Sequence, residues 1–291
     1  NNFYYTAICS FFIIVFFSSV PLISDYQNNI FSSKELTNNS KNNFKKVLNN
    51  ENLKNELKSN KENNLENLFN DIFKFEDLPS DTVRLSATTL EQLFKDTNYN
   101  LKDVRKTKLV KPVSLSLLPG EIKNIQNSQK KKNLFIKIIL PLAIEENNRI
   151  KLDRSKLFSI LNKNHNSEFE KRWLNNKFKQ YGVINRDMSS LKIRMDIIPV
   201  SLIIAQAAKE TGWGTSRFAI EGNALFGQWT WTGDGIKPAG ADDDATHKVM
   251  KFKVLKASVR AYQRNLNTHK SYKKFRILRA ELRDNNKNLD S

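Results

Sequence analysis

The chain has 291 residues, enough for one large or two small domains. Hydrophobic residues make up 39% of it, below the ~45–50% of typical globular chains, so a packed core throughout is excluded. The formal net charge of +18 indicates a polyanionic partner, such as nucleic acid, an anionic membrane surface or an acidic cell-wall polymer.

Residues 1–24, "NNFYYTAICSFFIIVFFSSVPLIS", carry no charge and contain an apolar run. Its length suits the core of a signal peptide or a short membrane anchor. We therefore expect the protein to be exported, with this segment engaging the membrane or the export machinery. Cys9, the only cysteine, lies inside the run, so no disulfide is expected.

Residues 25–84 are rich in Asn, Lys, Ser and Glu and are expected to form a disordered, low-complexity linker. Residues 85–150 are expected to be a helical extension of the following domain. Ser86 is suited to cap its first helix, and Pro141 interrupts a strongly apolar stretch, where a kink or break is expected.

Residues 151–291 are expected to form the main domain. "SEFEKRWLNNKFKQYG" is amphipathic, with Phe169 and Trp173 on one side and Gly182 as a stop. The segment from Asn223 to Leu255 is rich in glycine and aromatic residues and ends in an alternating pattern, which predicts a short hairpin or flap. The expected class is α+β, mainly α, with one small β element.

The stretch "PVSLIIAQAAKETGWG" predicts a helix that starts after Pro199 and stops at Gly212. The i, i+3, i+4, i+7 spacing puts Glu210 on its apolar stripe and in its last turn. Apolar surroundings and the negative helix end both disfavour the ionised carboxylate, so Glu210 is expected to keep a proton near neutral pH. Such a group can act as the general acid of glycoside hydrolysis.

Trp213 is expected to supply part of the apolar wall around Glu210. Gln206, one turn earlier, is placed to hydrogen-bond the carboxyl group.

"PVSLIIAQAAKETGWGTSRFAIEGNALFGQW" and "VLKASVRAYQRNLNTHKSY" resemble the Bax-type branch of bacterial glucosaminidases in glycoside hydrolase family 73. The likeness extends over roughly residues 85–282. It implies a lysozyme-like fold for residues 151–291 and hydrolysis of the β-1,4 bond between N-acetylglucosamine and N-acetylmuramic acid in peptidoglycan. It also implies a location in the periplasm, or on the inner membrane facing it.

The resemblance places Glu210 at the general-acid position and Tyr262 at that of an active-site tyrosine. Asn223 and Phe226, in "NALFG", match the segment after the catalytic helix and are expected to line the groove or support it. Family members usually carry a second acid some thirty residues after the first, in the β element. Asp243 and Asp244 are the favoured candidates here, and Asp234 and Asp242 are also available.

Trp229 and Trp231 flank the expected groove and, at i, i+2 in an extended segment, point to one side, where they could stack on sugar rings. The three histidines are isolated, so no metal site is expected, and no nucleotide motif indicates a cofactor. Peptidoglycan strands are the expected partner of a monomer, and nucleic acid is not. A lytic transglycosylase and a non-catalytic wall-binding module remain as alternatives.

Overall fold

The computed structural model describes residues 83–230, 235–238, 248–287 and 289. Within this part the chain is mainly helical, with one small antiparallel sheet, which confirms the predicted class. All of it falls in the compact unit Glu62–Ser291.

The helices that precede the predicted catalytic stretch begin with α4 (Ala87–Asp96) and α5 (Leu101–Thr107). The Ser86 hydroxyl accepts a hydrogen bond from the Thr89 amide at 3.0 Å, so this residue caps α4 as predicted. The 3₁₀ turn η1 (Gly120–Asn124) then leads into α6 (Ser128–Leu161).

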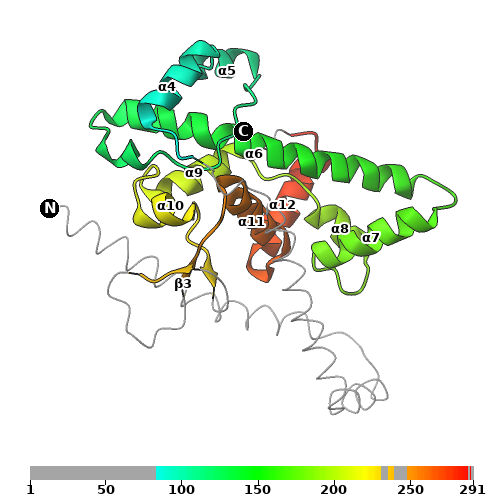
Figure 1. The fold of residues 1–291 in the computed structure, drawn as a ribbon. Coiled ribbons are helices and arrows are strands. Elements are labelled where there is room, and N and C mark those ends of the chain that lie inside the picture. Colours follow the sequence, from blue (N-terminus) through cyan, green and yellow to red (C-terminus); the bar gives the residue numbers. More distant parts are fainter. Residues whose placement is uncertain (1–82, 231–234, 239–247, 288, 290–291) are drawn as a thin grey trace. The chain divides into compact units, whose positions relative to one another are not determined.

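Helix α6 is 34 residues long and continues through Pro141, so the expected break there is absent. Proline removes the hydrogen bond that the carbonyl of Lys137 would accept. Burial on both sides of the ring offsets this loss, because Leu140, Leu142 and Ala143 all lie in the core. Figure 1 shows α6 as one uninterrupted helix, with α4 and α5 on one side and the other helices mainly on the opposite side.

Two hydrophobic clusters lie along α6. The first contains Phe135, Ile138 and Leu142 of α6, and α9 (Val200–Thr211) and α11 (Leu255–Thr268) pack there. The second is built on Leu157 and Ile160, covered by α7 (Glu168–Gln180) and α8 (Met188–Arg194). Helix α7 buries Leu174 and Phe178, whereas Phe169 is exposed, contrary to the predicted apolar face.

The remaining elements all come after α9 in the sequence. They are α10 (Arg217–Gly222), β1 (Trp229–Thr230), β2 (Gly235–Ile236), β3 (Lys248–Met250), the 3₁₀ turn η2 (Lys270–Tyr272) and α12 (Lys273–Asp284). The sheet has the order β1-β3-β2. Strand β3 pairs antiparallel with both others, with Val249 opposite Trp229 on one side and Ile236 on the other.

Candidate active site

Helix α9 begins and ends where the sequence predicts. Pro199 is its N-cap, and Gly212 is the C-cap at φ 57°, a left-handed conformation that glycine adopts without a steric penalty. The hydroxyl of Thr211 donates to the carbonyl of Ala207 and accepts from the amide of Gly214, which fixes the turn that follows. Glu210 therefore lies in the last turn of the helix.

The expectation that Glu210 is buried is wrong, because its side chain is exposed. The buried residues of α9 are Ile203, Ala207, Ala208 and Thr211. At about 100° per residue this buried face centres between Ala207 and Thr211, and Glu210 lies about a quarter of a turn from that centre. The carboxylate thus stands at the border between the core and solvent.

Two neighbours fix the position of this carboxylate. The amide Nε2 of Gln206 donates a hydrogen bond to Oε1 of Glu210 at 2.7 Å. The other oxygen, Oε2, faces Gly227, because a Cβ atom added to that glycine would lie 3.6 Å from it. Gly227 has φ +59° and follows directly after Phe226, so the "NALFG" segment lies beside the end of α9.

Phe226 and Tyr262 form the wall next to this carboxylate. Their rings are stacked, with centroids 4.0 Å apart and an angle of 5° between the planes. Both are buried in the first cluster. Burial raises the pKa of Tyr262, and the nearby Tyr272 and Glu210 raise it further. Tyr262 is therefore a neutral phenol at physiological pH, close enough to Glu210 to sense its charge.

Asn223 ends α10 and connects it to the segment after the sheet. Its side-chain amide donates to the carbonyls of Phe252 at 2.9 Å and Lys253 at 3.2 Å. The side chain is buried, and its φ of 52° completes the helix cap. These contacts favour a supporting role for Asn223 over a role in lining the groove. Its part in substrate binding stays a prediction.

Trp213 packs toward α6. Its ring meets that of Phe135 edge-on at 6.0 Å, and the ammonium of Lys132 lies 5.2 Å from its centroid. Its backbone amide donates to the carbonyl of Ala208, which closes the end of α9. Trp213 thus anchors the turn behind Glu210 against the core.

Trp229 opens β1 and is exposed, as a sugar platform requires. Trp231, Asp243 and Asp244 lie outside the described residues, as do Asp234 and Asp242. The structure thus brings Gln206, Glu210, Phe226 and Tyr262 together and gives no position for the second acid.

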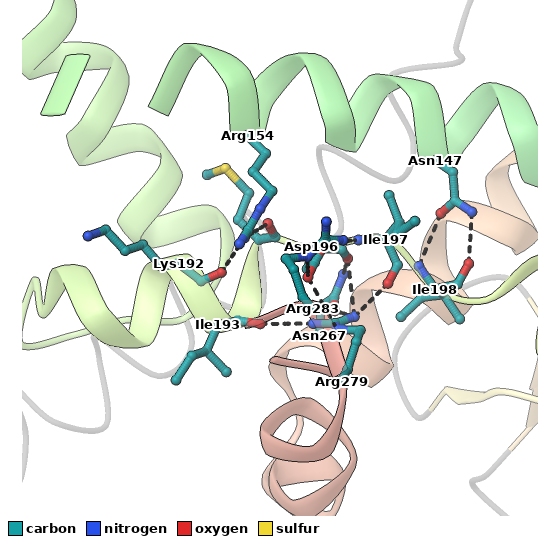
Figure 2. Close-up of polar contacts among 11 residues, drawn as sticks. Asn147, Arg154, Lys192, Ile193, Asp196, Ile197, Ile198, Asn267, Arg279 and Arg283 are labelled. Atoms are coloured by element: carbon teal, nitrogen blue, oxygen red, sulfur yellow. Dashed lines mark hydrogen bonds and ion pairs between the residues drawn. The ribbon is translucent and has the colours of Figure 1, made fainter. Parts of the chain in front are cut away.

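A polar network missed by the sequence reasoning holds the connector between α8 and α9. Asp196 is buried in this connector, and its carboxylate accepts hydrogen bonds from Nε of Arg283 at 2.8 Å and Nη2 at 2.5 Å. Arg279 donates to the carbonyls of Ile193, Asp196 and Ile197, as Figure 2 shows. Helix α12 thereby positions the start of α9.

Three further side chains complete this network. Asn267, in the "NLNTH" motif, donates to the carbonyl of Asp196 and accepts from Arg279. Asn147 of α6 pairs with both backbone groups of Ile198, and Arg154 donates to the carbonyls of Lys192 and Met195 (Figure 2). The sequence signal for this network is the arginine spacing in "RILRAELR".

A second buried acid, Glu146 of α6, binds α11. Arg260 donates to both its carboxylate oxygens at 2.8 Å, and Arg149 donates to Oε2 at 3.1 Å. This bidentate pair fixes the helix that carries Tyr262 against the helix that supports α9.

Within the described ranges, no three His, Cys, Asp or Glu side chains gather where a metal ion could bind. Over the same part of the chain, no helix has both the length and the apolar content to cross a membrane.

Comparison with known proteins finds one family model and one relative that match this chain. Residues 186–289 match the family model described as mannosyl-glycoprotein endo-beta-N-acetylglucosaminidase. The chain is also 33% identical over 174 residues to "Protein bax" of Escherichia coli (strain K12), an alignment that covers 58% of this chain and 62% of that relative. No solved structure matches the chain. Residues 186–289 are therefore similar to a glucosaminidase domain, and the alignment with the Bax protein spans less than two thirds of that relative.

Proposed function

We propose that the protein is a peptidoglycan hydrolase, an endo-β-N-acetylglucosaminidase that cleaves the β-1,4 bond between N-acetylglucosamine and N-acetylmuramic acid. Glu210 is the general acid in this proposal. The match to a glucosaminidase family model supports a glycan-hydrolysing activity. The observation that carries the proposal is the placement of the Glu210 carboxylate at an exposed helix end, with one oxygen held by Gln206.

The two carboxyl oxygens are not equivalent. Oε1 accepts the hydrogen bond from Gln206, which suits the carbonyl oxygen of a protonated acid. Oε2 then carries the proton on the side of Gly227, which has no side chain of its own to block a glycosidic oxygen. A bound glycan would cover the exposed carboxyl group, and the loss of water would disfavour its ionised form. Proton transfer to the leaving oxygen then accompanies bond cleavage.

Tyr262 is proposed to orient the reacting sugar. Its buried phenol stays protonated and so offers a hydrogen-bond donor next to Glu210. Asp243 or Asp244 would activate a water or attack the sugar directly, according to its distance from Glu210. If neither reaches the sugar, its own acetamido oxygen would be the nucleophile, and Tyr262 would hold that group. Trp213, Asn223, Phe226, Trp229 and Trp231 are proposed to line or support the groove.

The test is digestion of purified peptidoglycan by the parent chain and by Glu210→Gln. Glutamine keeps the shape and the contact with Gln206 but has no proton to transfer, so the rate should fall roughly a hundredfold or more. Glu221→Gln is the matched control, because Glu221 is an exposed glutamate on the neighbouring helix α10 and should be dispensable. Turbidity clearing gives the rates.

The products separate the alternatives. New reducing-end N-acetylglucosamine supports the glucosaminidase, whereas anhydro-muramic ends identify a lytic transglycosylase. A parent chain that binds peptidoglycan without releasing either product is a wall-binding module. Equal rates for the parent and Glu210→Gln contradict the assignment of Glu210.

The proposed substrate requires export. We propose that the protein acts in the periplasm or from the inner membrane, which agrees with the uncharged apolar run in residues 1–24. Protease accessibility of the protein in intact and osmotically opened cells tests this location.

A further inference from the structure

Helix α12 is packed with its charged side inward. Arg276 and Arg279 are only 3% and 2% exposed, whereas Ile277, Leu278 and Leu282 are 40%, 49% and 37% exposed. Charged residues are rarely buried without partners, and surface helices usually turn their aliphatic residues to the core. Two things therefore need an explanation: what holds the arginines of α12 inside the protein, and what its exposed aliphatic residues contact.

The cause on the inner side is hydrogen bonding to backbone carbonyls. Arg276 donates to the carbonyls of Leu266 and His269, each at 2.8 Å, and so closes the end of α11. Arg279 satisfies carbonyls in the connector before α9 (Figure 2). Rotating α12 to bury its aliphatic residues would leave these carbonyls and two guanidinium groups unpaired, so the outward face is fixed.

The outward face is an apolar stripe bordered by lysines. At about 100° per residue, Ile277, Leu278 and Leu282 fall within about 140° of the helix surface. Lys274 and Glu281 lie on the same side, and Lys270, Lys273 and Lys287 are exposed near the two ends.

The chemistry of this face favours a lipid surface over other occupants. Three half-exposed aliphatic side chains offer far less than the ~500 Å² per partner that a specific protein interface needs, which argues against a second copy. Nucleic acid is bound through phosphate contacts and, in single strands, through base stacking on aromatic rings, and neither uses the three central aliphatic residues. Aliphatic residues flanked by lysines are what a helix lying in the plane of an anionic bilayer presents.

We propose that the outward face of α12, Ile277, Leu278 and Leu282 with Lys270, Lys273 and Lys274, docks on the headgroup region of an anionic membrane. The helix is too short to span a bilayer, so it lies along the surface. This contact does not depend on catalysis by Glu210. It would hold the domain at the membrane independently of residues 1–24.

The test places an environment-sensitive fluorophore on the stripe in the full chain. Cys9→Ser removes the native thiol, and Glu281→Cys carries a nitrobenzoxadiazole label. A second chain carries the label at Leu109→Cys, an exposed position two residues after α5 ends. Helix α5 lies on the other side of α6 from α12 (Figure 1). Vesicles of phosphatidylglycerol and phosphatidylcholine are compared with vesicles of phosphatidylcholine alone.

The proposal expects a blue shift at position 281 with the anionic vesicles, reversed by high salt, and none at position 109. Adding Ile277→Gln and Leu278→Gln should raise the lipid concentration for half-maximal shift roughly tenfold, since two aliphatic contacts are lost. Ile184→Gln, at an exposed aliphatic residue between α7 and α8, is the control and should leave it unchanged.

Several outcomes would overturn the proposal. One is an unshifted label at 281 on chains that sediment with the vesicles, since residues 1–24 then hold the protein without α12. Another is an equal shift with neutral vesicles, which removes the role of the lysines. A shift that appears without lipid as protein concentration rises would show that a second copy covers the stripe.

Discussion

At the scale of single residues, the sequence predicts the position of Glu210 along its helix but not the residues that surround it. Glu210 was located from the Gly212 stop and the apolar periodicity of α9, and it does lie in the last turn. The sequence does not predict its exposure, because i+3 and i+4 spacing shows which residues share a face of the helix. It does not show where the centre of the buried face lies. The neighbours Gly227 and Tyr262 are 17 and 52 positions away from Glu210 in the sequence, and no local pattern encodes their proximity.

Gly227→Ala tests whether the space beside Oε2 of Glu210 matters. An added Cβ would lie 3.6 Å from this oxygen, where the proposed substrate oxygen must approach. The positive φ should also cost about 1 kcal/mol of stability. We expect hydrolysis of peptidoglycan to fall at least tenfold, which is more than this loss of stability explains.

Gly182→Ala is the matched control for backbone strain. Gly182 has φ +63° and lies after α7, in the second cluster's part of the fold. It should lose similar stability in urea denaturation and keep its activity. If both variants keep full activity, Gly227 does not border the reacting bond.

At the scale of elements, the sequence predicts where helices begin and end better than it predicts what packs around them. The cap at Ser86 and the stop at Gly212 depend on local hydrogen bonds or local backbone conformation, and both occur. The continuity of α6 through Pro141 and the burial of Arg276 and Arg279 depend on tertiary partners distant in sequence. Local propensity carries no information about such partners.

Asp196→Asn tests the network that positions α9. The change leaves Arg279 and Arg283 without their anionic partner beside a buried connector, and breaking a buried pair costs about 3 kcal/mol. We expect the free energy of unfolding in urea to fall by about this amount. The matched change Glu168→Gln, in an exposed pair with Lys171, should cost under ~0.5 kcal/mol.

Equal losses for these two variants would mean that Asp196 is paired no more strongly than a surface residue. The orientation of α12 would then rest on the hydrogen bonds of Arg276 and Arg279 to backbone carbonyls, without a contribution from the Asp196 carboxylate.

At the scale of the whole described unit, α6 joins two hydrophobic clusters that have different roles. The first carries α9, the "NALFG" segment and α11, and so every described residue of the candidate site except the exposed Trp229. The second stabilises the far half of α6 with α7 and α8. The first cluster also buries two tyrosines, Tyr99 and Tyr262, whose ionisation makes the stability of the unit depend on pH.

Tyr99 gives the clearest prediction for stability. Its side chain is 1% exposed, its ring meets Phe94 edge-on at 5.3 Å, and its hydroxyl has no hydrogen-bond partner within the described ranges. A buried polar group without a partner is destabilising, so Tyr99→Phe should raise the free energy of unfolding by about 1 kcal/mol at pH 7. The ring contacts remain.

The same change should flatten the alkaline limb of the stability curve. Burial raises the pKa of Tyr99 in the folded protein, so above the unfolded-state pKa of about 10 the unfolded chain releases this proton first. The parent then loses up to about 1.4 kcal/mol per pH unit that Tyr99→Phe does not lose. Urea denaturation from pH 7 to 11 measures both effects, with Tyr272→Phe as the exposed control. Parallel curves for the parent and Tyr99→Phe would mean that Tyr99 reaches water in the folded protein.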